Sequence, residues 1–192
     1  MLDSLLIKNF RSLEHLEVPK LGRVNLMVGK NNSGKSTVLE ALRIYAGNAQ
    51  RPLLEAIAQE HDERYRTRES ETMDEGTLMP FQDFFRDRSF PQDGTAIEIG
   101  SATGASELLR ISYEMMEESL GEPELLEGET INRIRRRYVP LDEADMFPGE
   151  LQPVILVRKG ERLFPPIKLL NGARRTSAYD LSSVPCSLIP TQ

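Results

Sequence analysis

The residues best suited to chemistry are a lysine and its hydroxyl neighbours in the glycine-containing run Gly29–Thr37 (G-K-N-N-S-G-K-S-T). Gly29 and Gly34 have no Cβ, so the backbone can curl and turn successive N–H groups inward. Those donors, together with the positive end of a following helix, form a cradle for phosphate oxygens. We expect Lys35 to reach the β- and γ-phosphates of a nucleotide and the Ser36 hydroxyl to ligate the Mg²⁺ that bridges them.

The spacing fits G-x-x-x-x-G-K-[ST], the Walker A or P-loop pattern. Alternation over Arg23–Val28 predicts a strand running into the loop, and Thr37–Ala46 predicts a helix leaving it, with Val38, Leu42 and Tyr45 on one face. Asn32 is either a phosphate contact or a simple turn-former. The predicted phosphate-binding residues are Gly29, Asn31, Asn32, Ser33, Gly34, Lys35, Ser36 and Thr37.

Length and composition predict a cytoplasmic, globular chain without a membrane partner. The 192 residues are 39% hydrophobic and 28% charged, and the longest apolar run, Val154–Val157, is far too short to cross a bilayer. Asp3, Lys8 and Arg11 interrupt any signal-peptide core. The single cysteine, Cys186, excludes an internal disulfide framework and fits a reducing compartment.

The net charge of −6 argues against a protein that coats nucleic acid. The net negative charge is concentrated in Glu114–Glu150, where 11 acidic and four basic side chains give −7 and leave the remainder of the chain at +1. The four basic residues are Arg133, Arg135, Arg136 and Arg137. We interpret this run as a solvated face that neutralises neighbouring glutamates, with nucleic-acid contact as the alternative.

A family resemblance lies in Leu6–Ser12 (L-I-K-N-F-R-S) followed by Val24–Leu42, which contains G-x-N-x-S-G-K-S. This opening resembles the RecF-like and structural-maintenance-of-chromosomes-like (SMC) ATPases. It is most similar to the branch of AAA family ATPases that contains the overcoming-lysogenization-defect (OLD) proteins and related antiphage ATPases. The resemblance covers residues 1 to about 46. It implies an α/β fold: a P-loop NTPase of ATP-binding-cassette (ABC)/SMC-head type with an antiparallel β-subdomain, incomplete in this chain.

The resemblance also implies a ligand, an assembly and a role. The ligand is ATP with Mg²⁺, and Lys35 is the catalytic group that stabilises the transition state together with the metal. The heads dimerise head-to-tail, which gives a homo-oligomer, and they couple to DNA or to a nuclease or effector partner in DNA repair or antiphage defence. Arg11 matches the family's arginine after the first strand, near the nucleotide or the DNA face. A solvated arginine at a strand end is the alternative.

The rest of the chain is expected to form one ATPase-head N-terminal lobe over 1–192. Its segments are a strand meander, P-loop and first helix (1–50), a helical and polar insertion (51–93), a β-hairpin (94–114), an acidic insertion (115–150) and returning strands with a tail (151–192). Met1–Asn9 and Glu14–Val18 are the expected first strands. Glu60–Glu75 is interpreted as an exposed helix end or disordered loop, or as a DNA or partner surface through its arginines, Arg64, Arg66 and Arg68. His61 is interpreted as a surface residue.

Parts that ATP hydrolysis needs are not recognisable. Leu141-Asp142-Glu143 is the only Walker-B-like run, and the charges and proline before it cannot lie in a central sheet. Leu181–Val184 lacks the signature glycine, and Gln82 and Gln92 are the only candidates for a metal-sensing glutamine. We therefore expect ATP binding without efficient hydrolysis by this chain alone. The alternative is a non-catalytic nucleotide-sensing module that orders a partner surface; the chain has no N-K-x-D motif of a GTPase.

Overall fold

The computed structural model describes residues 2–61, 81–104, 107–126 and 129–169 of the chain. Its first two strands form the antiparallel pair that the sequence predicts. β1 (Leu5–Phe10) pairs with β2 (Leu13–Val18), with Ile7 opposite Leu16. The turn between them is Arg11-Ser12, in which Arg11 takes a left-handed conformation with φ 51°.

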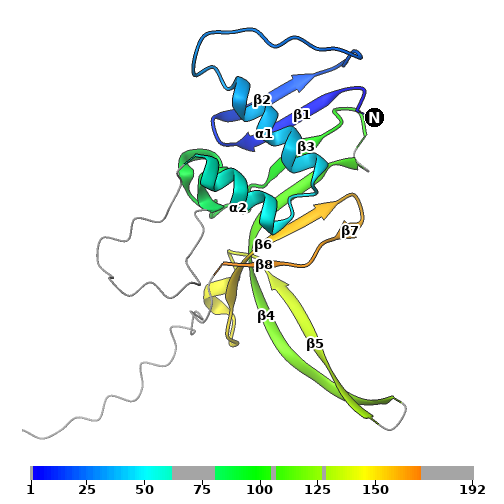
Figure 1. Cartoon of the computed structure of the whole chain (residues 1–192). Coiled ribbons are helices and arrows are strands. Elements are labelled where there is room, and N and C mark those ends of the chain that lie inside the picture. Colours follow the sequence, from blue (N-terminus) through cyan, green and yellow to red (C-terminus); the bar gives the residue numbers. More distant parts are fainter. Residues whose placement is uncertain (1, 62–80, 105–106, 127–128, 170–192) are drawn as a thin grey trace, which may run out of the picture.

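The strands join into one eight-stranded sheet in the order β2-β1-β3-β4-β6-β7 (Figure 1). Its further strands are β3 (Ile97–Gly100), β4 (Leu109–Leu126), β5 (Glu129–Val139), β6 (Gln152–Lys159), β7 (Arg162–Leu163) and β8 (Ile167–Lys168). β5 pairs with β4, and β8 pairs with β6. Every pairing is antiparallel, which confirms an α/β chain with an antiparallel sheet.

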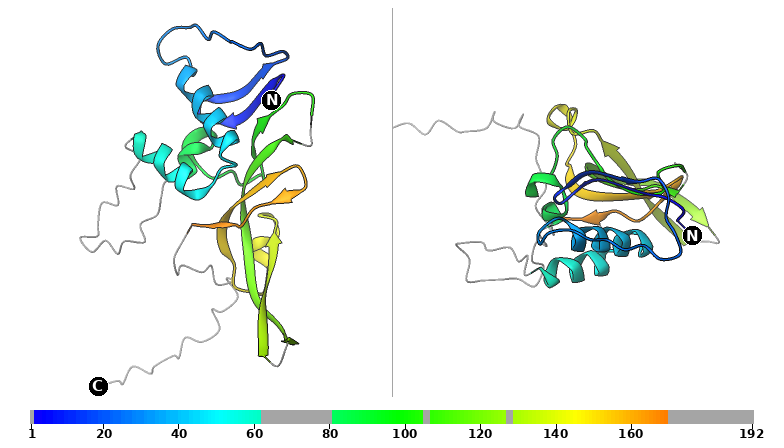
Figure 2. Two further views of the ribbon diagram at one scale, coloured as in Figure 1. Left: turned by 45° about the vertical axis from the view of Figure 1, so that its right-hand side comes forward. Right: turned by 90° about the horizontal axis from the view of Figure 1, so that it is seen from above.

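Two helices cover one face of this sheet, as the view from above shows (Figure 2). They are α1 (Lys35–Ala46) and α2 (Arg51–Glu60). Ile44 of α1 and Ile57 of α2 are fully buried and belong to the same core cluster as Ile7 and Ile99 of the sheet. Short 3-10 helices of the described residues are η1 (Phe81–Phe84) and η2 (Arg86–Arg88), between α2 and β3, and η4 (Ala144–Met146), between β5 and β6. Phe81, Phe84 and Phe85 pack into this core.

The acidic segment 115–150 is largely a long hairpin that projects from the body (Figure 1). The charges before Asp142 were expected to exclude a buried strand, and β5 is a strand on which Arg135, Arg136 and Arg137 remain exposed. In the β4–β5 register, Glu118 lies opposite Arg136, and Glu118 Oε1 accepts a hydrogen bond from Arg136 Nε at 3.0 Å. Cross-strand charge pairs of this kind stabilise a sheet edge in water. For Arg136, this agrees with the interpretation that the basic run neutralises neighbouring glutamates.

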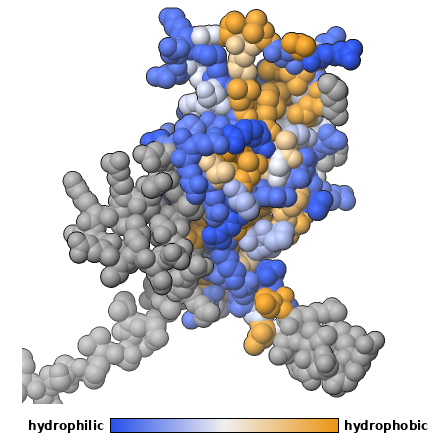
Figure 3. Space-filling model, in the orientation of Figure 1, coloured by the Kyte–Doolittle hydropathy of each residue, from blue (hydrophilic) through white to orange (hydrophobic). Residues whose placement is uncertain are grey.

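The prediction of a strand over Arg23–Val28 is wrong for the described structure. This segment is irregular, and Val24 and Leu26 are 91% and 87% exposed. A strand requires a neighbour to accept and donate its backbone hydrogen bonds, and none of the described strands pairs with this segment. An apolar area is visible at the top of the surface view, where the chain runs towards α1 (Figure 3).

Candidate phosphate-binding site

The Walker A run forms a loop that ends at the N-terminus of α1. Two features place its glycines where a side chain would not fit. Gly34 is the N-cap of α1 with φ 83°, and a Cβ built on it would lie 3.1 Å from Leu13 Cδ2. A Cβ on Gly29 would lie 2.8 Å from Ser33 Oγ. Gly34 is therefore favoured by its left-handed conformation and by its contact with the β1–β2 hairpin, whereas a Cβ on Gly29 would require the Ser33 hydroxyl to move.

The side chain of Lys35 folds back into the loop that precedes it. Its Nζ donates hydrogen bonds to the carbonyl oxygens of Gly29 at 2.9 Å and Lys30 at 2.5 Å. The helix hydrogen bonds begin with Val38 N–H donating to Gly34 O at 3.0 Å, so the N–H groups before Val38 have no intrahelical acceptor. A cationic amine and the open N-terminus of a helix thus face the same loop, and both attract an anion.

An open cavity of about 500 Å³ lies over this loop. Ser12 contributes from the β1–β2 turn and His61 from the residue after α2. Among the described residues, the cavity is lined by Ser12, Asn31, Asn32, Ser33, Gly34, Lys35, Ser36, Thr37 and His61. All predicted residues from Asn31 to Thr37 are thus brought together. Gly29 contributes its carbonyl to Lys35, and Asn32 has φ 61°, a left-handed conformation that Asn tolerates.

These features fit the phosphates of a nucleotide with its divalent cation. The loop offers backbone curvature without Cβ obstruction, one amine, and the hydroxyls of Ser36 and Thr37 on the cavity wall. A nucleotide polyphosphate carries several negative charges, which the amine would attract. Mg²⁺ binds oxygen ligands, including hydroxyl and phosphate oxygens. The candidate metal ligand Ser36 therefore lies at the wall of the cavity that would hold the phosphates.

Arg11, a predicted site residue, does not line the cavity but lies behind it. Its Nε forms an ion pair with Glu40 Oε2 at 2.9 Å, and its guanidinium lies over the Phe84 ring at 5.1 Å. The other carboxylate oxygen of Glu40 is 2.7 Å from His61 Nε2. Arg11 and Glu40 have only 11% and 8% of their side chains exposed.

The link between Glu40 and His61 is the part of the site that sequence reasoning missed. His61 is indeed partly exposed, with 40% of its side chain accessible, but it also faces the Walker A loop. A signal was present on α1, because Glu40 shares the buried face of the helix with Val38 and Ala41. An acid on an apolar helix face requires a partner.

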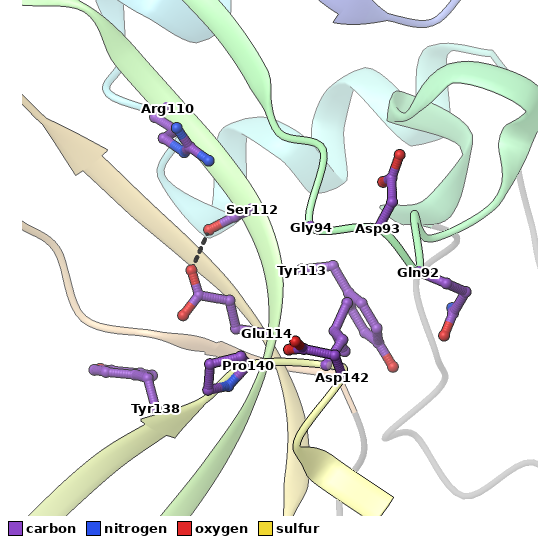
Figure 4. Close-up of a pocket in the computed structure, with 11 residues that line it drawn as sticks. Gln92, Asp93, Gly94, Arg110, Ser112, Tyr113, Glu114, Tyr138, Pro140 and Asp142 are labelled. Atoms are coloured by element: carbon purple, nitrogen blue, oxygen red, sulfur yellow. Dashed lines mark hydrogen bonds between the residues drawn. The ribbon is translucent and has the colours of Figure 1, made fainter.

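The Walker-B-like run lies elsewhere. Asp142 follows β5 and lines a different pocket at the root of the hairpin, which Gln92 also lines (Figure 4). Within that pocket Ser112 donates a hydrogen bond to Glu114 at 2.6 Å. This pocket shares no lining residue with the Walker A cavity, and Gln82, on η1, lines neither. Leu181–Val184 and the arginines at 64, 66 and 68 lie outside the described residues.

Comparison with known proteins gives one family and several partial relatives. The family described as "AAA ATPase domain" matches residues 1–115, which include every element of the Walker A site. An uncharacterised protein of Methanocaldococcus jannaschii is 44% identical over 45 residues, 23% of this chain and 20% of that protein. An "ATP/GTP phosphatase" of Helicobacter pylori is 36% identical over 52 residues, 27% of this chain and 14% of that protein.

A third relative is an "OLD nuclease" of Thermus scotoductus, 44% identical over 48 residues, 25% of this chain and 9% of that protein. The alignments thus cover a fifth or less of each relative's own length. No solved structure matches the chain. The matches confirm the resemblance of the chain's N-terminal region to AAA and OLD-type ATPases.

Among the helices of the described residues, none has the length and apolar character needed to span a membrane.

Proposed function

Because the chain belongs to the AAA ATPase domain family, we propose that it binds ATP with Mg²⁺ in the Walker A cavity. The observation that carries this proposal is the position of Lys35, whose Nζ lies within hydrogen-bonding distance of the loop carbonyls at the open end of α1. An ammonium group held there would exchange those carbonyls for phosphate oxygens, which are stronger acceptors because they are charged.

Each residue of the loop has a role in this binding. The N–H groups of the loop and of the first turn of α1 donate to phosphate oxygens, and Lys35 adds a positive charge. Ser36 and Thr37 supply hydroxyls, of which Ser36 ligates the metal. When bound, Mg²⁺ neutralises charge on the β- and γ-phosphates and lowers the barrier to their separation.

Hydrolysis by this chain alone would be inefficient. Within the part of the chain that the structure describes, the side chains that line the Walker A cavity include no carboxylate to orient the attacking water. The chain thus acts as the ATP-binding lobe of an ABC/SMC/OLD-like head, completed in a head-to-tail oligomer. DNA repair or antiphage defence, with DNA or a nuclease as partner, is the role that the OLD relative favours. The lack of a carboxylate in the cavity lining also favours the alternative of a nucleotide-sensing module.

The test is calorimetric titration of ATP with Mg²⁺ into the chain, with phosphate release followed on the same samples. Lys35→Ala should weaken ATP binding by about 10- to 100-fold, the range expected for lost charge-assisted hydrogen bonds. Lys30→Ala is the matched control, because Lys30 lies in the same loop and contributes its backbone carbonyl to Lys35. Equal affinity of all three proteins, or no binding by any, would refute the proposal. Steady phosphate release by the wild type would refute the inefficient-hydrolysis part.

A further inference from the structure

We propose that His61 contacts the phosphates of the bound nucleotide, and that Glu40, clamped by Arg11, is the positioning residue that fixes the His61 ring. The inference rests on the proposed function of the Walker A cavity and adds a binding residue from outside the motif. It starts from one juxtaposition: His61 follows α2, yet it lines the same cavity as the loop that precedes α1.

Glu40 is a buried acid whose two carboxylate oxygens each contact a named side chain. It is 6% exposed, and a buried carboxylate requires an opposite charge or hydrogen-bond donors to compensate its lost hydration. Arg11 compensates one oxygen by charge, through an ion pair of its Nε with Glu40 Oε2 at 2.9 Å that is not a hydrogen bond. The guanidinium carbon of Arg11 lies 5.1 and 5.9 Å from the rings of Phe84 and Phe10. The second oxygen accepts from His61. Oε2 of Glu40 is thus held by Arg11, and Oε1 of Glu40 contacts His61, which lines the cavity.

The bond to Glu40 determines which nitrogen of His61 carries hydrogen. An ionised carboxylate accepts but cannot donate, so Nε2 of His61 carries the proton in the 2.7 Å contact. Nδ1 is then the nitrogen available to the cavity. A ring that carries hydrogen on both nitrogens donates from each of them, so such a ring can bond Glu40 and a phosphate oxygen at the same time.

The chain offers a matched control, because its only other histidine is His15. His15 lies on β2 and is 53% exposed, with its Nε2 at 3.5 Å from Glu17. We would record imidazole nitrogen and carbon NMR spectra of the full chain while adding ATP with Mg²⁺. The signals of His61 should show Nε2 protonated before addition and should shift on addition. The signals of His15 should stay in place, and in Lys35→Ala neither histidine should respond.

Affinity measurements on variants complete the test. His61→Ala should weaken ATP binding by about tenfold, the loss of one charge-assisted hydrogen bond, and His15→Ala should bind as the wild type does. Glu40→Gln keeps the side-chain volume and should abolish the fixed Nε2–H form of His61 while weakening ATP binding. If His61→Ala only lowers the melting temperature, with unchanged affinity and unmoved His61 signals, the pair is structural and the inference is wrong. If the wild type binds no ATP, the proposed function fails first. Binding lost in Lys35→Ala but retained in His61→Ala overturns this inference alone.

Discussion

Leu13 of β2 closes over Gly34 of the Walker A loop so tightly that a Cβ on Gly34 would lie 3.1 Å from Leu13 Cδ2. The hairpin before the loop therefore forms one wall of the phosphate site, and the neighbouring Ser12 lines the cavity directly. Two features favour glycine at position 34: the close contact with Leu13, and a φ of 83° in the left-handed region. The antiparallel pair at the N-terminus thus has a direct part in shaping the loop.

Gly34→Ala should destabilise the chain and abolish ATP binding. The left-handed conformation alone costs about 1 kcal/mol for a non-glycine residue, and the contact with Leu13 adds to it. Gly94→Ala is the matched control, because Gly94 has φ 73° but no atom within 4 Å of the position that a Cβ would take. Urea denaturation of both variants would separate the cost of the left-handed conformation from the cost of the contact with Leu13. ATP titration of both variants would show whether binding is lost only in Gly34→Ala. Equal loss of stability in the two variants would mean that Leu13 yields without cost.

Glu40→Ala should lower the free energy of unfolding by about 3 kcal/mol, because Arg11 would remain buried without its carboxylate. Replacing both partners, as in Arg11→Met with Glu40→Leu, should restore most of this stability, since two apolar side chains carry no desolvation cost. Chemical denaturation of Arg11→Met, Glu40→Leu and the double variant forms a double-mutant cycle that measures the coupling of the two side chains. Strictly additive losses would show that the two side chains are not coupled.

The hairpin should lose stability in acid through Glu118. Lys168 and Arg136, which donate hydrogen bonds to its two oxygens, lower the pKa of Glu118 from 4.5 to about 2. A lowered pKa means that the ionised form stabilises the fold, so this contribution is complete above pH 4.5 and is lost as the pH falls towards 2. The wild type should exceed Glu118→Gln in melting temperature at about pH 6 and match it near pH 2. A difference that does not change with pH would contradict the ion-pair explanation.

Two residues of α1 give a direct test of its packing. Ile44 is fully buried between helix and sheet, and Leu39 on the same helix is 62% exposed. Ile44→Ala should cost about 2–4 kcal/mol of unfolding free energy through lost burial and the cavity left behind. Leu39→Ala should change it by no more than about 0.5 kcal/mol. Urea titration of both variants checks the pair, and a large effect at Leu39 would indicate that this face is covered in solution.

Local signals in the sequence were sufficient for the elements that depend on local chemistry. The β1–β2 pair, the helix after the Walker A loop and the hairpin of β3 and β4 follow from alternation, glycine placement and helical spacing. Long-range partners could not be obtained in this way. The bond between Glu40 and His61 joins residues 21 positions apart. β5 is a strand because it pairs with β4, in a register that places Glu118 opposite Arg136.

In the segment before the Walker A loop, a local pattern predicted a strand that the structure does not contain. Val24, Leu26 and Val28 alternate as a strand should, but alternation reports only which side chains could share a face. Whether a strand forms depends on a neighbour, and no strand of the described ranges takes that place. The pattern therefore predicted the character of the residues correctly and their secondary structure wrongly.

The same segment also bears on how the chain behaves during folding and purification. Val24, Leu26 and Val28 together expose a short apolar ribbon, with exposed fractions of 91%, 87% and 77%. Extended apolar ribbons without ladder partners pair readily with the edges of other sheets, including those of identical chains. We therefore expect these three residues, which lie next to the candidate phosphate-binding loop, to promote association between chains, so the stretch that leads into the site is also an aggregation hazard.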